Sequence, residues 1–248
     1  MIALKNWLKH LPNILTSLNL LCGCFSIVIA FNNNLITASY FILVAAFFDF
    51  ADGFSARLFK AYSELGKQLD SLADIISFGL APAIIVHILL KSHLNVPENI
   101  FNLAIHEIVQ IFLPFLIVVF SALRLAKFNI STNQSEQFLG LPTPANALFF
   151  ISIPLIIEFE NLEFITNFIN NRIFILTALA LSCFLLVANF PMFGLKFKDF
   201  SFKNNVYRYL FVIISVILLV IFKFSGIPLI IIMYVFLSAI NNWVIRIF

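Results

Sequence analysis

Long apolar stretches run through this chain, and they limit what it can fold into. A helix that spans a bilayer needs about 20 predominantly apolar residues, within a range of about 17–25. Most of the stretches have this length, and short polar connections separate them. We therefore predict about eight transmembrane helices, at about residues 12–31, 35–60, 67–91, 105–128, 142–159, 171–190, 206–223 and 226–247.

The composition agrees with a membrane protein. Hydrophobic residues make up 62% of the chain and charged residues only 11%, whereas a soluble domain has about 45–50% and about 25%. No polar stretch is long enough to form a soluble domain, and there is no P-loop, nucleophile elbow or nucleic-acid-binding signature. The predicted fold is all-α, a polytopic membrane protein that forms one domain over residues 1–248.

The positive charges are unevenly distributed between the connections. If both chain ends lie in the cytoplasm, 12 of the 15 Lys and Arg residues lie on that side, and Lys91, Arg172 and Lys223 lie outside. Cytoplasmic loops of membrane proteins carry an excess of Lys and Arg. We therefore predict a multi-pass protein of the inner (cytoplasmic) membrane, in which the connection between the second and third helices faces the cytoplasm.

Negative charge is concentrated in one segment. Asp49 and Asp52 are spaced i, i+3, and Asp70 and Asp74 are spaced i, i+4, so each pair lies on one face of its helix. Two such helices packed face to face would put four carboxylates into one pocket, where they would repel one another. A divalent cation removes this repulsion, and oxygen ligands suit Mg²⁺, Mn²⁺ or Ca²⁺. Ionisable residues at membrane depth mark a functional site by default.

Two glycines and an arginine accompany the carboxylates. Gly53 lies one turn after Asp49, and Gly66 lies one turn before Asp70. Each glycine clears space beside a carboxylate row, so that a ligand or another backbone can approach closely. Hard divalent ions usually work with substrate phosphates, and Arg57 could bind a phosphate. The segment therefore predicts a metal-dependent site for a phosphate-bearing substrate.

This segment resembles the signature of the CDP-alcohol phosphatidyltransferase family at all eight motif positions. It reads Asp49-x-x-Asp52-Gly53-x-x-Ala56-Arg57, eight residues, Gly66-x-x-x-Asp70-x-x-x-Asp74. The resemblance implies an enzyme of membrane helices that transfers the phosphatidyl group of CDP-diacylglycerol to an alcohol and releases CMP. It also implies a divalent metal cofactor and, by analogy with relatives, a homodimer.

The resemblance also implies roles for single residues. Asp49, Asp52 and Asp70 are expected to bind the metal. The acceptor hydroxyl must lose a proton, so one carboxylate should act as a base. We assign that role to Asp74, the last motif aspartate, with metal contact as a second role. The residues expected to bind the CDP moiety within the motif are Asp52, Gly53, Ala56, Arg57 and Gly66.

A polar stripe marks the first predicted helix, which Pro12 is suited to begin. Asn13, Thr16 and Asn19 are spaced three apart on an otherwise apolar helix. Such side chains commonly form hydrogen bonds between membrane helices. The stripe also resembles the P-N-x-x-T-x-x-N pattern of the same family, which implies a place in the nucleotide pocket. We therefore expect these three residues to bind CDP-diacylglycerol.

Two later segments concern the acceptor alcohol. The sequences L-R-L-A-K-F-N at 123–129 and G-L-P-T-P-A at 140–145 resemble segments of the phosphatidylserine synthases within the family. The resemblance implies L-serine as the acceptor. The cations in the first segment could hold a serine carboxylate, or they could simply snorkel to the membrane edge. The expected serine-binding residues are Arg124, Lys127, Asn129 and Thr143.

The motif-bearing core covers about residues 12–190, and two additional helices follow at about 206–247. One alternative within the family is a different acceptor, either glycerol phosphate or an inositol-type alcohol. An alternative from another class is an ion or proton transporter, which would place carboxylates near the middle of the membrane. Here the carboxylates are predicted at one face of the membrane, close in sequence to Arg57, which could bind a phosphate. CDP-diacylglycerol, L-serine and the lipid bilayer are the predicted partners, and no nucleic acid is expected.

Overall fold

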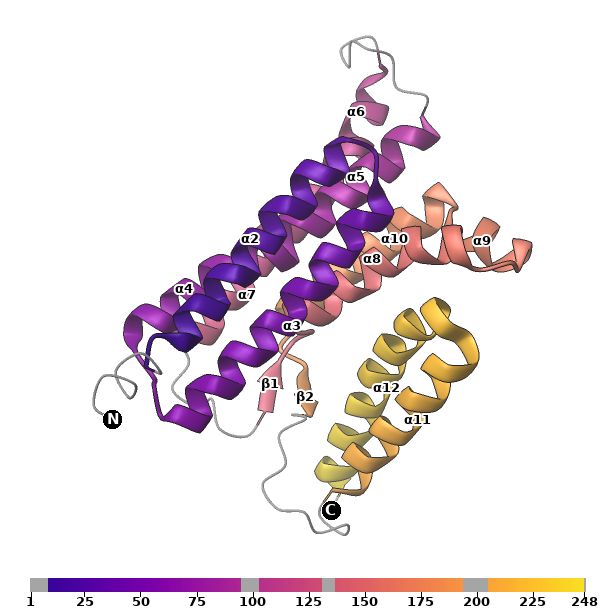
Figure 1. Cartoon of the computed structure of the whole chain (residues 1–248). Helices are drawn as coiled ribbons and strands as arrows, with labels where there is room; N and C mark the ends of the chain where they lie inside the picture. The colour runs from indigo at the N-terminus through magenta and orange to yellow at the C-terminus, as the bar shows by residue number, and fades with distance from the viewer. Residues whose placement is uncertain (1–8, 95–102, 131–136, 194–204, 248) are drawn as a thin grey trace. The chain divides into compact units, whose positions relative to one another are not determined.

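The computed structural model describes residues 9–94, 103–130, 137–193 and 205–247 (Figure 1). Its helices pack into two compact units, residues 1–122 and 123–248. The two units are defined by how the residues pack, and they do not show that the chain has two functional domains. That the chain acts as one catalytic domain over residues 1–248 stays a prediction.

The first unit begins with a helical hairpin. Helix α2 (Leu11–Phe31) has Pro12 in its first turn, as predicted, and helix α3 (Leu35–Phe59) follows after three residues. The side chain of Asn34 caps α3 by accepting a hydrogen bond from the backbone N–H of Thr37 at 3.0 Å. Farther along, the buried Ser26 hydroxyl donates to the Ala38 carbonyl at 2.8 Å and ties the two helices together.

The next helical stretch, Glu64–His93, contains a π-helical turn that we did not predict from the sequence. Helix α4 ends at Asp74, a π-helical turn η1 follows, and α5 continues the stretch. The Ala81 N–H reaches the Ile76 carbonyl across this turn. Pro82 has no N–H to give to the helical ladder, which is a known cause of such breaks. The bounds are α4 (Glu64–Asp74), η1 (Ile75–Leu80) and α5 (Ala81–His93).

The first unit is completed by a fourth helical stretch, whose last residues belong to the second unit. A short 3₁₀ turn that contains Pro114 interrupts it. His87 of α5 anchors the stretch, because its ring nitrogen contacts the Ile111 carbonyl and its ring lies against Phe112 and Phe115. The elements are α6 (Ile105–Phe112), η3 (Leu113–Phe115) and α7 (Leu116–Ile130).

The second unit combines helices with one small ribbon. Strands β1 and β2 pair antiparallel, with Phe138 opposite Met192. Gly140 follows β1 with φ +74°, and an added Cβ there would lie 2.5 Å from the Leu186 carbonyl oxygen. The elements are β1 (Gln137–Leu139), α8 (Thr143–Phe159), α9 (Glu163–Ile169), α10 (Arg172–Val187), β2 (Pro191–Phe193), α11 (Val206–Phe222), η4 (Lys223–Ser225) and α12 (Gly226–Ile247).

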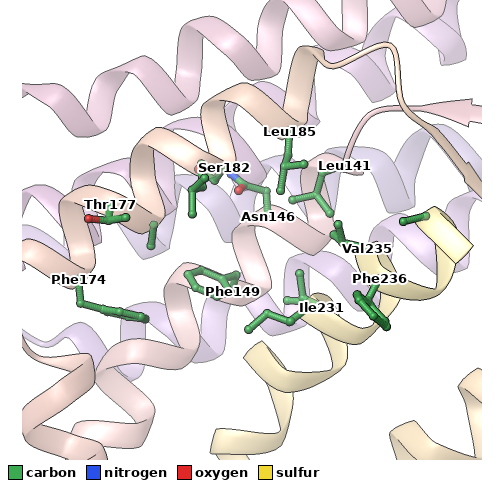
Figure 2. Close-up of a pocket in the computed structure, with 14 residues that line it drawn as sticks. Leu141, Asn146, Phe149, Phe174, Thr177, Ser182, Leu185, Ile231, Val235 and Phe236 are labelled. Atoms are coloured by element: carbon green, nitrogen blue, oxygen red, sulfur yellow. The ribbon is translucent and has the colours of Figure 1, made fainter.

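An apolar cavity of about 440 Å³ lies within the second unit. Side chains from α8, α10 and α12 line it, among them Phe149, Leu185 and Ile231 (Figure 2). One buried hydrophobic cluster of this unit joins the ribbon to the last two helices. Its buried residues are Leu141, Met192, Phe211, Ile231 and Tyr234.

The predicted all-α membrane fold is confirmed, but the count of eight spans is not. In the described residues, five helical stretches are long and apolar enough to cross a membrane, or six if the bent α9–α10 pair is one span. Helix α8 has 17 residues, and Pro154 lies inside it. The α9–α10 pair is bent by 58°, and Arg208–Ile240 counts as one stretch. Even so, η4 separates α11 from α12, and the two lie side by side (Figure 1).

Candidate active site

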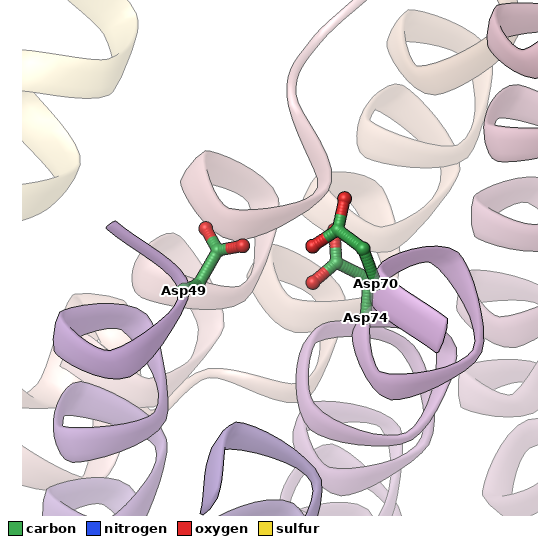
Figure 3. A group of neighbouring side chains, drawn as sticks. All are labelled: Asp49, Asp70 and Asp74. Carbon is green, nitrogen blue, oxygen red and sulfur yellow. The ribbon is translucent and has the colours of Figure 1, made fainter. Parts of the chain in front are cut away.

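Three carboxylates meet in the first unit. One oxygen each from Asp49, Asp70 and Asp74 lies within 4.8 Å of the others. Asp49 comes from α3, and the other two come from α4, across the gap between these helices (Figure 3). Oxygen ligands lie about 2.0–2.6 Å from Mg²⁺ or Ca²⁺, so ligands on opposite sides of the ion are about 4–5 Å apart. The three side chains therefore fit a divalent cation in both chemistry and spacing.

The fourth predicted ligand, Asp52, is not among these three. It is buried, with 6% of its surface exposed. The Thr16 hydroxyl donates to Asp52 Oδ2 at 2.6 Å, and it also lies 3.0 Å from the Pro12 carbonyl. A hydroxyl has one proton to donate, and a charged acceptor at the shorter distance is the stronger partner. Asp52 lies on α3 one helical turn after Asp49, and its hydrogen bond to Thr16 joins it to α2.

Asp74 is also held from α2. Its side chain is 7% exposed, and its Oδ1 accepts a hydrogen bond from the Asn19 side-chain amide at 3.4 Å. Asn19 is fully buried, and its Oδ1 has no hydrogen-bond partner among the residues that the structure describes. The polar stripe of the first helix therefore faces the carboxylates.

Helices α2 and α4 run in the same direction beside the site. Near their beginnings, an added Cβ on Gly66 would lie 2.9 Å from Asn13 Oδ1. Near the end of α4, Asp74 contacts Asn19, and Ser77 just beyond donates to the Asn19 carbonyl at 2.9 Å. Thr16 and Asn19 of the stripe thus form hydrogen bonds between helices, which was one of the two interpretations of the stripe. Its role in nucleotide binding stays a prediction.

The two motif glycines have different surroundings. Gly66 is packed closely, because an added Cβ would also lie 3.0 Å from Ser63 Oγ, the hydroxyl that caps α4. At Gly53, an added Cβ would meet a single side-chain atom of the described residues, Arg57 Nη1 at 3.8 Å. Ala56 is half-buried and Arg57 is exposed in the last turn of α3. As far as the described residues go, the space beside Gly53 is therefore open, as a ligand-facing glycine requires.

The four predicted serine-binding residues belong to the second unit. Arg124, Lys127 and Asn129 lie on α7, where Arg124 is buried and Lys127 is exposed. Thr143 begins α8 and is fully buried, and its hydroxyl has no hydrogen-bond partner within the described part of the chain. A role of these residues in binding serine stays a prediction.

Sequence reasoning missed two features near the carboxylates. It singled out neither Ser77 nor the π-helical turn that contains it. Two signals were available: Ser77 is spaced i, i+3 from Asp74, and Pro82 interrupts the helical ladder soon afterwards. Wide turns of this kind often occur at functional sites.

Apolar helices long enough to cross a membrane, with a three-carboxylate cluster suited to a divalent cation, define an integral membrane protein with a candidate metal site. Residues 9–197 match the sequence profile described as CDP-alcohol phosphatidyltransferase, and the chain belongs to that family. The resemblance in the motif is thereby confirmed. The match ends before α11 and α12.

Curated relatives share about a third of the residues over the matched part. A CDP-diacylglycerol–serine O-phosphatidyltransferase of Helicobacter pylori is 34% identical over 145 residues, which are 58% of this chain and 56% of that protein. A protein of the same name from Bacillus subtilis is 30% identical over 139 residues, 55% of this chain and 71% of that protein. An archaetidylserine synthase of Methanothermobacter thermautotrophicus is 35% identical over 140 residues, 56% of this chain and 54% of that protein. This chain thus spans little more than half the length of the Helicobacter relative.

Proposed function

We propose that this chain is a CDP-diacylglycerol–serine O-phosphatidyltransferase, a phosphatidylserine synthase. The carboxylate cluster of Asp49, Asp70 and Asp74, set within the family motif, carries the proposal. In the reaction, the serine hydroxyl oxygen forms a bond to the phosphorus that bears the diacylglycerol. The bond between that phosphorus and the oxygen bridging to CMP breaks, and CMP leaves with this oxygen.

The aspartates would hold a divalent cation, Mg²⁺ or Mn²⁺, with Ca²⁺ as a further alternative. Asp49, Asp70 and Asp74 are the ligands that the geometry favours, and Asp52 would complete the motif set from one turn along α3. When bound, the ion neutralises the charge that develops on the pyrophosphate oxygens. Its presence also offsets the mutual repulsion of the carboxylates.

Asp74 is the proposed general base. The serine hydroxyl must lose its proton as the new bond forms, and a positioned carboxylate can accept it. Asp74 is buried and contacts Asn19, so its orientation is restricted before substrate arrives. Such preorganisation is what proton transfer at a defined atom requires.

The CDP moiety would bind along α2 and the end of α3. The open space beside Gly53 favours close approach of a phosphate or ribose, and the exposed Arg57 guanidinium can donate two parallel hydrogen bonds to phosphate oxygens. The other residues proposed for this site are Asn13, Thr16, Asn19, Asp52, Ala56 and Gly66.

L-serine is the proposed acceptor because of the two segments at 123–129 and 140–145, together with the names of the relatives. Arg124 and Lys127 would bind its carboxylate, with Asn129 and Thr143 nearby in the sequence motifs. Glycerol phosphate and inositol-type alcohols are the acceptors against which serine must be tested. Membership of the family gives the transporter alternative no support.

The proposed location is the inner membrane, with the active site facing the cytoplasm. The distribution of Lys and Arg supports this orientation. A lipid substrate and a water-soluble amino acid can meet only at such an interface. A homodimer is proposed by analogy with the family alone.

An acceptor screen tests the proposal. Purified protein in lipid nanodiscs would receive CDP-diacylglycerol, Mg²⁺ or Mn²⁺, and one acceptor at a time. CMP release and the lipid product would both be measured, with Asp70→Asn as the inactive control. We expect CMP release that depends on serine and forms phosphatidylserine. Release that depends on glycerol phosphate or inositol instead would overturn serine as the acceptor while keeping the family reaction.

A further inference from the structure

Ser77 is linked to the carboxylate cluster through Asn19. It is fully buried in the π-helical turn η1, three residues after Asp74. Its hydroxyl donates to the backbone carbonyl of Asn19 at 2.9 Å. The side chain of the same Asn19 donates to Asp74 Oδ1 at 3.4 Å. Ser77 therefore holds the backbone of the residue whose side chain contacts Asp74.

Gly23 brings the two backbones together at the same place. It lies on α2, one turn after Asn19, and is buried. An added Cβ on Gly23 would lie 2.8 Å from Ser77 Cα and 2.5 Å from Ser77 Oγ. Real Cβ atoms do not come this close to other atoms, so only glycine permits this separation between α2 and η1.

The π-helical turn makes these lateral contacts important. Helix α4 ends at Asp74, and the wider turn begins at the next residue. Hydrogen-bond geometry is less regular at such a break than within an α-helix. Asp74 is therefore held in place by its contacts to α2 as well as by its own helix.

We propose that Ser77 is a positioning residue for Asp74, with Gly23 setting the distance at which it acts. Through Asn19, the Ser77 hydroxyl sets where the Asp74 carboxylate lies relative to Asp49 and Asp70. This inference rests on the proposed function for the role of Asp74 in turnover, but its effect on cation binding can be measured without turnover. Partners that orient metal ligands typically change metal affinity by about 10–100-fold.

A matched pair of variants tests this. Ser26 is also a fully buried serine whose hydroxyl donates to a backbone carbonyl of a neighbouring helix, Ala38 at 2.8 Å, but it ties α2 to α3 away from the aspartates. Mn²⁺ binding to purified wild type, Ser77→Ala and Ser26→Ala would be followed by electron paramagnetic resonance without substrates. Thermal unfolding would be recorded in parallel. We expect Ser77→Ala to weaken Mn²⁺ binding about tenfold, and Ser26→Ala to bind as wild type with a similar loss of thermal stability.

Turnover gives a second readout. The kcat of Ser77→Ala should fall, because the Asp74 carboxylate is displaced. Ser77→Cys, which keeps a weak donor, should recover part of the Mn²⁺ affinity. Gly23→Ala, which keeps the hydroxyl but separates the helices, should weaken Mn²⁺ binding like Ser77→Ala. If Gly23→Ala does not fold, the comparison of Ser77→Ala with Ser26→Ala still decides.

The inference is overturned if Ser77→Ala and Ser26→Ala bind Mn²⁺ equally and have the same kcat. Failure of the proposed function looks different. In that case wild type binds Mn²⁺, and Ser77→Ala binds it more weakly, but no acceptor gives CMP release.

Discussion

The hydroxyl of Thr16 lies 2.6 Å from Oδ2 of Asp52 and joins α2 to α3 beside the carboxylate cluster. The two residues are 36 positions apart in the chain. Both are buried, with exposures of 3% and 6%. A residue of the polar stripe thus holds a residue of the family motif, so the first helix is part of the site rather than a membrane anchor alone.

Removal of this hydroxyl tests the contact. Thr16→Val keeps the shape of the side chain but removes the side-chain donor to the buried Asp52 carboxylate, which keeps a backbone hydrogen bond from Gly53. A buried polar group that loses its partner costs about 1–3 kcal/mol. We expect the free energy of unfolding in mixed detergent to fall by about that amount, and the KM for CDP-diacylglycerol to rise. Thr16→Ser keeps the donor and should behave like wild type. Equal stability of the valine and serine variants would contradict the hydrogen bond.

Metal removal and ligand replacement should both abolish activity. EDTA should stop CMP release, and added Mg²⁺ or Mn²⁺ should restore it. Asp49→Asn or Asp70→Asn should reduce kcat at least about 100-fold, because a bound ion contributes several kcal/mol of transition-state stabilisation and each 1.36 kcal/mol is a factor of ten in rate. Circular dichroism would check that the helices are retained. Undiminished turnover in EDTA would rule out the metal-dependent mechanism.

Asp74→Asn tests whether Asp74 acts in proton transfer or in binding CDP-diacylglycerol. The change removes the proposed base but keeps the size of the side chain. General base catalysis contributes about 10²–10⁴-fold, so kcat should fall by that factor. The KM for CDP-diacylglycerol should change far less. If the variant keeps its maximal rate and loses affinity for CDP-diacylglycerol, Asp74 is a binding residue and another group is the base.

The two motif glycines should respond differently to alanine. At Gly66, a new Cβ would meet Asn13 Oδ1 at 2.9 Å and must displace that side chain, so Gly66→Ala should have a lower thermal unfolding temperature than Gly53→Ala. At Gly53, the nearest atom would be Arg57 Nη1 at 3.8 Å. Alanine is favoured over glycine inside a helix by about 1 kcal/mol, so Gly53→Ala should be as stable as wild type or more so.

Activity completes this comparison. We expect Gly53→Ala to raise the KM for CDP-diacylglycerol despite its stability, because the added methyl group enters the space proposed for the substrate. Unchanged KM for CDP-diacylglycerol in this stable variant would show that the substrate does not approach α3 at Gly53.

Serine recognition is tested at Arg124. A charge-assisted hydrogen bond contributes about 1.5–3 kcal/mol, and 1.4 kcal/mol is a factor of ten in affinity. Arg124→Ala should therefore raise the serine KM about tenfold, with little change in the KM for CDP-diacylglycerol. Arg124→Lys should lie between wild type and alanine, because lysine supplies the charge but not the planar fork. Lys127→Ala is the companion variant at the exposed end of α7. An unchanged serine KM in both alanine variants would leave these cations a role at the membrane edge only.

Local patterns in the sequence determined where most helices lie and which aspartates share a helix face. The apolar stretches predicted the positions of most helices, and the i, i+3 and i, i+4 spacings predicted that the aspartates form rows on α3 and α4. These predictions hold because hydrophobic length and helical periodicity depend on residues that are close in the chain. The number of spans was predicted less well, because Pro154, the 58° bend and η4 change where a helix ends or turns.

Tertiary structure alone decided how the site is put together. The sequence predicted that four aspartates would meet, but the structure brings together three and pairs Asp52 with Thr16. It also places Ser77 against Gly23. These contacts join residues far apart in the sequence, and they depend on how closely and in which direction whole helices pack. A one-dimensional pattern carries the identity of the side chains, but the distance between two helices is set by the atoms that meet along their interface.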